Sequence, residues 1–149
     1  MESSSPVYYL DKEEVEEICF YLAERLFKFE EPLPEFKTRF PSKLESILEI
    51  PKHGFGNKEL YPTLLQKAAC YFYFIIKNHP FLNGNKRLAI LTTFVFLKLN
   101  NHTLKVPWKK MYDFAIGLAN GTEDHKKEFK KNSKIYYPTY FKRLKHFTS

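Results

Sequence analysis

Two strongly apolar segments joined by a short polar loop constrain the fold of this chain more than any other feature. Residues 62–78 and 86–99 carry apolar side chains at helical spacing, and residues 68–76 are apolar nearly all round. Pro62 suits the first turn of the earlier segment, and Pro80 ends that segment. The pattern therefore predicts two buried helices joined by a tight loop, with the first helix central in the domain.

Helical signals continue on both sides of this pair. Asp11 precedes a segment with one apolar face, and Asp11 with Glu14 has the spacing of a capping box. Ser42 opens a short helix, again with an acid three residues after the cap, and Pro51 stops it. Pro107 starts a last helix, whose apolar positions are Met111, Phe114, Ala115 and Leu118. These segments place the chain in the all-α class.

The stretch before the central helix contains the only weak strand signals. Residues 53–61 read HGFGNKELY, and they flank Gly54 and Gly56 with residues that can form a loop or a short hairpin. We therefore expect a compact helical bundle with a short hairpin or loop before the central helix.

Length and composition limit the class of protein further. A chain of 149 residues with 44% apolar residues fits one domain with a real core. Cys19 and Cys70 are too few for a disulfide framework or a cysteine metal site, so we expect buried thiols in a reducing compartment. No leader pattern is present, and the longest nearly uncharged apolar run, residues 88–97, is too short to cross a membrane. These features predict a cytoplasmic protein with no membrane partner.

The formal net charge of +7 comes from the C-terminal part of the chain. Basic and acidic residues balance over residues 1–125, whereas residues 126–149 are basic and contain Glu128 as their only acid. Aromatic residues alternate with these cations, which suits contact with RNA or an acidic partner. A solvated basic helix with a packed aromatic end is the simpler alternative. The sequence thus divides into a domain, residues 1–121, and a C-terminal extension, residues 122–149, packed on it or partly mobile.

The loop between the two apolar helices carries the candidate chemistry, and it reads HPFLNGNKR from His79 to Arg87. A helix that starts near Asn85 presents unpaired N–H groups and the positive end of its dipole. Gly84 lets the backbone approach a ligand closely. Lys86 and Arg87 place two cations where they oppose that dipole, which is favourable when an anion is bound. His79 adds a proton acceptor, so the loop predicts a site for phosphoryl chemistry.

This loop resembles the signature of the Fic/Doc (Fido) family, whose pattern is His-x-Phe-x-acid-Gly-Asn-(Gly or Lys)-Arg. Lys86, in the eighth place, is similar to the Doc (death-on-curing) branch. Flanking segments resemble Doc proteins in order and spacing, so the resemblance covers roughly residues 6–121. It implies a Fido-type helical bundle and a transferase that uses ATP and Mg²⁺ to modify a protein.

The resemblance also implies a role for each motif position. His79 would be the general base that takes a proton from a target hydroxyl, and Phe81 would be the buried anchor of the loop. The phosphates of the nucleotide would be bound by Gly84, Asn85, Lys86 and Arg87. The segment before the central helix corresponds to the family's flap, which pairs with a target peptide through strand-like hydrogen bonds. In this chain the target-docking flap residues would be Gly54, Phe55, Gly56 and Asn57.

Asn83 departs from the family pattern, because this position usually holds an acid that binds Mg²⁺. An amide oxygen can ligate Mg²⁺ but supplies no negative charge, so metal binding is expected to be weaker. The resemblance implies transfer of the γ-phosphoryl group of ATP to a hydroxyl of a cytoplasmic protein, for example in the translation machinery. AMP transfer is an alternative, but Lys86 argues against it. A second alternative is a catalytically impaired module that binds a nucleotide or a protein, and Asn83 argues for it.

The resemblance further implies control by a partner protein. Inhibitory helices of Fic-type enzymes carry a Glu followed by Gly or Asn, and no Glu of this chain has such a neighbour. The chain is therefore expected to act as the toxin of a toxin–antitoxin pair, with a separate antitoxin protein as its inhibitor.

Overall fold

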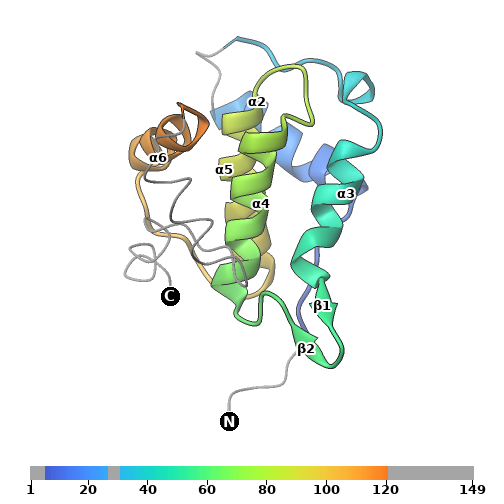
Figure 1. Ribbon diagram of the computed structural model, residues 1–149. Helices are drawn as coiled ribbons and strands as arrows, with labels where there is room; N and C mark the ends of the chain where they lie inside the picture. The colour runs from blue at the N-terminus through green and yellow to red at the C-terminus, as the bar shows by residue number, and fades with distance from the viewer. Residues whose placement is uncertain (1–5, 27–30, 121–149) are drawn as a thin grey trace.

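The computed structural model describes residues 6–26 and 31–120 as a helical bundle with a short hairpin (Figure 1). β1 (Gly54–Phe55) and β2 (Lys58–Glu59) form the hairpin. The helical elements are α1 (Lys12–Glu14), η1 (Val15–Phe20), α2 (Tyr21–Leu26), η2 (Phe36–Thr38), α3 (Lys43–Glu49), η3 (Ile50–Lys52), α4 (Leu64–Asn78), α5 (Asn85–Leu99) and α6 (Trp108–Asn120). The predicted all-α class is confirmed, whereas the C-terminal extension, residues 122–149, lies outside the described residues.

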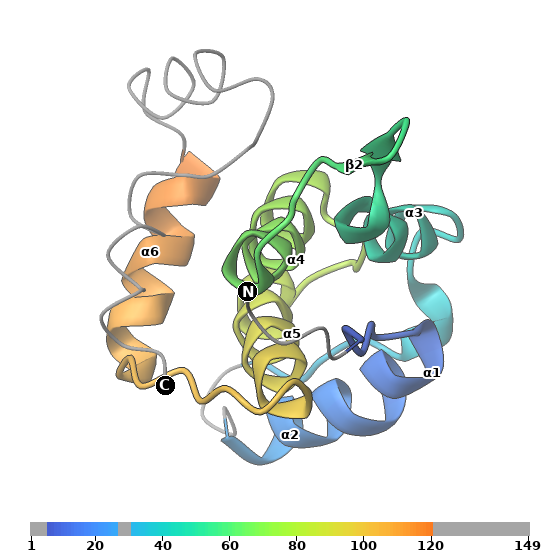
Figure 2. The same cartoon turned by 90° about the horizontal axis from the view of Figure 1, so that it is seen from below.

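The paired helices α4 and α5 form the centre of the bundle. They share the most extensive contact between any two elements of the described chain. In Figures 1 and 2, α6 lies on one side of this pair and α3 lies on the other, while α2 lies behind α5 in the view of Figure 1. Because neighbours cover it on several sides, α5 is buried along most of its length, from Leu88 to Leu97. The central position predicted for α4 is confirmed in the same way, since Ala68, Phe72 and Ile75 are fully buried.

Capping hydrogen bonds determine where the helices start, and the sequence predicts some of these bonds correctly. The capping box at Asp11 is confirmed: the Glu14 N–H donates to the Asp11 carboxylate at 2.9 Å, and the Asp11 N–H donates to Glu14 at 3.0 Å. The helix start predicted at Ser42 is confirmed, since Ser42 is the N-cap of α3, although its side chain makes no capping hydrogen bond. Glu45 instead accepts a bond from Arg39 at 2.8 Å. The π-helical turn η1 carries no sequence signal.

The start predicted for α4 is wrong, since Pro62 lies before the helix and outside its first turn. The cap is Thr63, whose hydroxyl accepts the Gln66 N–H at 3.1 Å. The Gln66 side chain in turn accepts the Thr63 N–H at 3.0 Å. This second capping box satisfies backbone groups at the helix start, so α4 begins two residues after the proline, at Leu64.

A buried lysine fastens the hairpin to the first turn of α4. The Lys67 side chain is 1% exposed, and its ammonium donates to the Glu59 carboxylate at 2.6 Å. It also donates to the carbonyl of Tyr61, and it lies 3.5 Å from the carbonyl of Pro51. Pro51 precedes the hairpin, Glu59 belongs to it and Tyr61 follows it. A single ammonium therefore holds the whole segment against α4.

We expect Lys67→Met to lower the free energy of unfolding by about 3 kcal/mol, because the two carbonyls lose their buried donor. For a chain of this length the Tm then falls by roughly 6–12 °C, which differential scanning calorimetry measures. Glu59→Gln is the matched control, because it removes the charge of the ion pair at a side chain that is 56% exposed and keeps both carbonyl bonds of Lys67. An equal loss in both variants would assign the effect to the ion pair and not to the carbonyl bonds.

Both cysteines are buried and free, as the sequence predicts. Burial raises the pKa of the Cys19 thiol to about 12, although the hydrogen bond to Thr92 acts in the opposite direction. Burial likewise raises the pKa of the Cys70 thiol to about 12. Thiols of this kind remain protonated and unreactive at neutral pH. Within the described residues, no helix has the length and apolar character needed to cross a membrane.

Candidate active site

The motif loop joins α4 to α5 at the end of the bundle that lies at the top of Figure 1. A residue in the left-handed backbone region stands at each end of this loop. His79, the C-cap of α4, has φ 50° and donates its N–H to the Ile75 carbonyl at 3.2 Å. Gly84, the N-cap of α5, has φ 76°. Glycine adopts this conformation without strain, whereas a histidine there is uncommon and is held by its surroundings.

Phe81 and Asn85 fix the shape of the loop. Phe81 is 2% exposed and packs edge-on against Phe20, with ring centroids 5.2 Å apart. The Asn85 side chain accepts the Phe81 N–H at 3.1 Å and donates to the Phe81 carbonyl at 3.0 Å. Asn85 thus uses its amide to brace the loop, and its backbone N–H lies at the start of α5, where an anion can bind.

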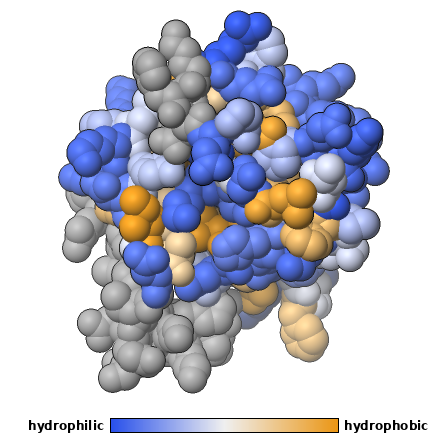
Figure 3. All heavy atoms as spheres, turned by 90° about the horizontal axis from the view of Figure 1, so that it is seen from above, coloured by the Kyte–Doolittle hydropathy of each residue, from blue (hydrophilic) through white to orange (hydrophobic). Residues whose placement is uncertain are grey.

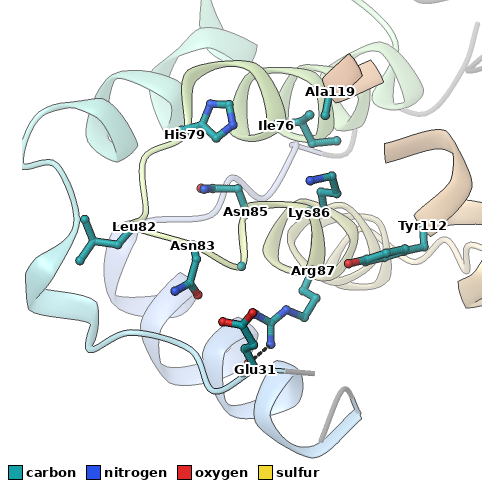
Figure 4. A pocket seen from close by; sticks show the side chains of 11 residues that line it. Glu31, Ile76, His79, Leu82, Asn83, Asn85, Lys86, Arg87, Tyr112 and Ala119 are labelled. Carbon is teal, nitrogen blue, oxygen red and sulfur yellow. Dashed lines mark hydrogen bonds between the residues drawn. The ribbon is translucent and has the colours of Figure 1, made fainter. Parts of the chain in front are cut away.

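A pocket of about 280 Å³ opens beside the loop and collects most of the predicted site (Figure 4). Side chains of the loop and of the first turn of α5 surround this opening. Phe81 does not line the pocket, because it lies in the core underneath. The predicted site residues that do line it are His79, Asn83, Gly84, Asn85, Lys86 and Arg87.

The pocket is suited to an anionic ligand. The N-terminus of the 15-residue helix α5 faces it, and the first turn of α5 holds no acidic residue. Lys86 and the buried Arg87 add two cations. Within the described part of the chain, Arg87 donates to the Glu31 carbonyl at 2.6 Å, which uses one of the five N–H donors of its guanidinium. Figure 3 looks onto this end of the molecule, where hydrophilic side chains dominate the surface.

Four lining residues come from outside the motif, and sequence analysis missed the two polar ones. Glu31 precedes Arg87 by 56 residues in the sequence, and Tyr112 lies in α6. Neither residue has a spacing or a local pattern that marks it, since both reach the pocket through tertiary packing. Conservation across homologues is the signal that could have found them.

A second hollow meets the first at His79. It lies at the N-terminal end of α3 and is lined by Ser42, Lys43, Ser46, Lys77, Asn78 and His79. His79 is the only residue that lines both hollows in the described part of the chain. Its imidazole is exposed, so a group that enters from either side can reach it.

The structure does not bring the predicted flap to this site. The hairpin forms as expected, with Gly54 opposite Glu59 and Phe55 opposite Lys58. It lies at the start of α4, whereas the motif loop lies at the end of that helix (Figure 1). Fifteen helical residues span about 22 Å. Gly54, Phe55, Gly56 and Asn57 therefore lie far from the pocket, and none of them lines it.

Comparison with known proteins gives the class to which this fold and site belong. A family model described as the Fic/DOC family matches residues 9–97, which is more than half of the chain. The chain therefore belongs to the Fic/Doc family.

Among curated proteins, the chain is similar to the protein named Toxin Doc from Mycolicibacterium smegmatis, with 32% identity over 66 residues. That match covers 44% of this chain and 51% of the relative, so it spans about half of the relative's length. No solved structure matches this chain at a significant level.

Proposed function

We propose that this protein is a Doc-like phosphotransferase, which moves the γ-phosphoryl group of ATP to a hydroxyl of a cytoplasmic protein and acts as a toxin with a cognate antitoxin. The observation that carries the proposal is the position of His79 between two hollows. One hollow has the cations and helix N-terminus that phosphates require. The other is open to an acceptor. Family membership and the similarity to Toxin Doc support the same assignment.

In this mechanism the chain positions the phosphates and removes one proton. Lys86, Arg87 and the N–H groups at the start of α5 hold the triphosphate in the first hollow. The acceptor enters the second hollow, and its oxygen attacks the γ-phosphorus while the bond to the β–γ bridging oxygen breaks and ADP leaves. His79 takes the proton of the acceptor hydroxyl. Catalysis then comes from positioning and from charge stabilisation, which is typical of phosphoryl transfer.

The donor groups at the pocket fit a nucleotide-bound Mg²⁺. The Asn83 amide oxygen is a hard ligand, and Glu31 adds a carboxylate to the lining. When bound, Mg²⁺ neutralises charge on the phosphates. No group of three or more His, Cys, Asp or Glu residues gathers in the described chain, so the site depends on the nucleotide for further ligands.

ATP labelled distinguishably at the α and γ phosphorus tests the proposal, with Mg²⁺ and a cytoplasmic extract as the source of acceptor. We expect the γ label alone to appear on protein in a reaction that requires His79. Transfer of the α label would replace the proposal with AMP transfer. Transfer of neither label, with ATP bound, would favour a binding module.

Asn83→Asp is expected to raise activity at limiting Mg²⁺. The exposed side chain keeps its size and gains a charge, so the Mg²⁺ concentration for half-maximal transfer should fall about tenfold. A titration of label transfer against Mg²⁺ measures this change. Asn78→Asp, at an exposed position of the second hollow, is the control for added charge. An unchanged Mg²⁺ requirement in Asn83→Asp would remove position 83 from the metal site.

A further inference from the structure

One acidic side chain lines the phosphate pocket within the described residues, and it is Glu31. It shares the lining with the cations Lys86 and Arg87. A carboxylate at a site for phosphates is unfavourable by itself, because like charges repel. Its presence is favourable when a cation lies between the carboxylate and the phosphates. The lining thus contains the negative charge that the motif lacks at position 83.

The backbone around Glu31 is held against the motif. Its carbonyl accepts the Arg87 Nη1–H at 2.6 Å. Two residues later, the Leu33 side chain covers Gly84 so closely that a Cβ atom on Gly84 would meet Leu33 Cδ2. In Figure 4 the Glu31 carboxylate and the Asn83 amide lie on the same side of the pocket. Two contacts between the segments therefore keep Glu31 beside Asn83.

The Glu31 carboxylate is not committed to a protein partner among the described residues. Arg87 is bonded through the Glu31 backbone, and no salt bridge between the described side chains includes Glu31. A substitution of the carboxylate thus leaves the contact to Arg87 in place.

We propose that Glu31 supplies the carboxylate ligand for the Mg²⁺–nucleotide complex, in place of the acid that the motif lacks at Asn83. The proposal rests on the nucleotide-binding part of the proposed function. Mg²⁺ is commonly held by one or two carboxylates together with substrate phosphates and waters, and Glu31 with the Asn83 amide matches that requirement. Glu31 lies 52 positions before Asn83 in the sequence, so the compensation arises only in the folded chain.

Binding of Mn²⁺, a paramagnetic substitute for Mg²⁺, tests this role without any acceptor. Electron paramagnetic resonance measures the Mn²⁺ affinity of the full chain in the presence of the non-hydrolysable ATP analogue AMP-PNP. We expect Glu31→Gln to weaken Mn²⁺ binding at least about tenfold. Glu35→Gln is the matched control, because it removes the same charge four positions later from a residue that does not line the pocket. Thermal unfolding of each variant shows that it is folded.

A double variant separates ligation from a structural effect. Glu31→Gln combined with Asn83→Asp moves the carboxylate to the motif position and should restore Mn²⁺ affinity to within about threefold of the wild type. Equal Mn²⁺ affinity of Glu31→Gln and the wild type would overturn the proposal. A gain in metal-free AMP-PNP affinity with unchanged Mn²⁺ binding would also overturn it, because Glu31 would then only repel phosphate.

The same measurements distinguish this proposal from the proposed function. If Mn²⁺ binding depends on Glu31 but no label is transferred to protein, the metal site stands and the phosphotransferase is wrong. If label is transferred and Mn²⁺ binding is independent of Glu31, the phosphotransferase stands and the metal role of Glu31 is wrong. A wild-type chain that binds neither AMP-PNP nor Mn²⁺ would contradict both.

Discussion

His79→Ala is expected to lower transfer of the γ label by a factor of about 10²–10⁴ while ATP stays bound. The imidazole is exposed where the two hollows meet, and the cations and α5 N-terminus that hold the phosphates are unchanged by the substitution. The loss should therefore appear in kcat for transfer and not in the affinity for nucleotide. Initial rates of label transfer and a separate ATP-binding titration measure the two quantities.

A second variant removes the imidazole and keeps the backbone preference. His79 has φ 50°, a conformation that asparagine tolerates better than alanine. His79→Asn should thus fold like the wild type and transfer as little label as His79→Ala. His102→Ala is the matched control, because His102 is exposed beyond the far end of α5. Wild-type transfer by His79→Asn would show that another group takes the proton.

Phe81→Ala is expected to lower the free energy of unfolding by about 4 kcal/mol. The ring is 2% exposed and contacts Phe20 and Phe36, with centroids 5.2 and 6.2 Å away, so its removal leaves a cavity under the motif loop. The bonds between the Phe81 backbone and the Asn85 side chain lose their packed support. Chemical denaturation, followed by tryptophan fluorescence or circular dichroism, measures the change.

Leu82→Ala is the control for Phe81, since the next side chain along the loop is 57% exposed. We expect a change in stability below about 0.5 kcal/mol at this position. At low temperature, where Phe81→Ala remains folded, ATP binding should also weaken because the loop is no longer held. A Phe81→Ala variant with wild-type stability would be inconsistent with an anchor in the core.

The sequence predicts the helices and the local geometry of the loop because both depend on neighbours along the chain. Apolar spacing in residues 64–78 and 86–99 reflects which faces are buried in α4 and α5. The loop joins two helix ends within a few residues, so His79, Gly84 and Arg87 meet at one pocket as expected. The error at Pro62 and the missing side-chain bond at Ser42 are also local. Several residues can cap a helix start, and the side chain that makes the hydrogen bond decides among them.

Tertiary structure alone decided which distant segments lie beside the motif loop. The length and direction of α4 place the hairpin at the far end of the bundle, although it is close to the motif in sequence and resembles the family's flap. Packing of the segment at Glu31 against Gly84 and Arg87 brings a carboxylate to the pocket from 56 residues before Arg87. Periodicity and caps report on contacts within about four residues, so they determined the elements and the motif of this protein. The partners of the motif depend on how those elements pack, and only the folded chain fixes that arrangement.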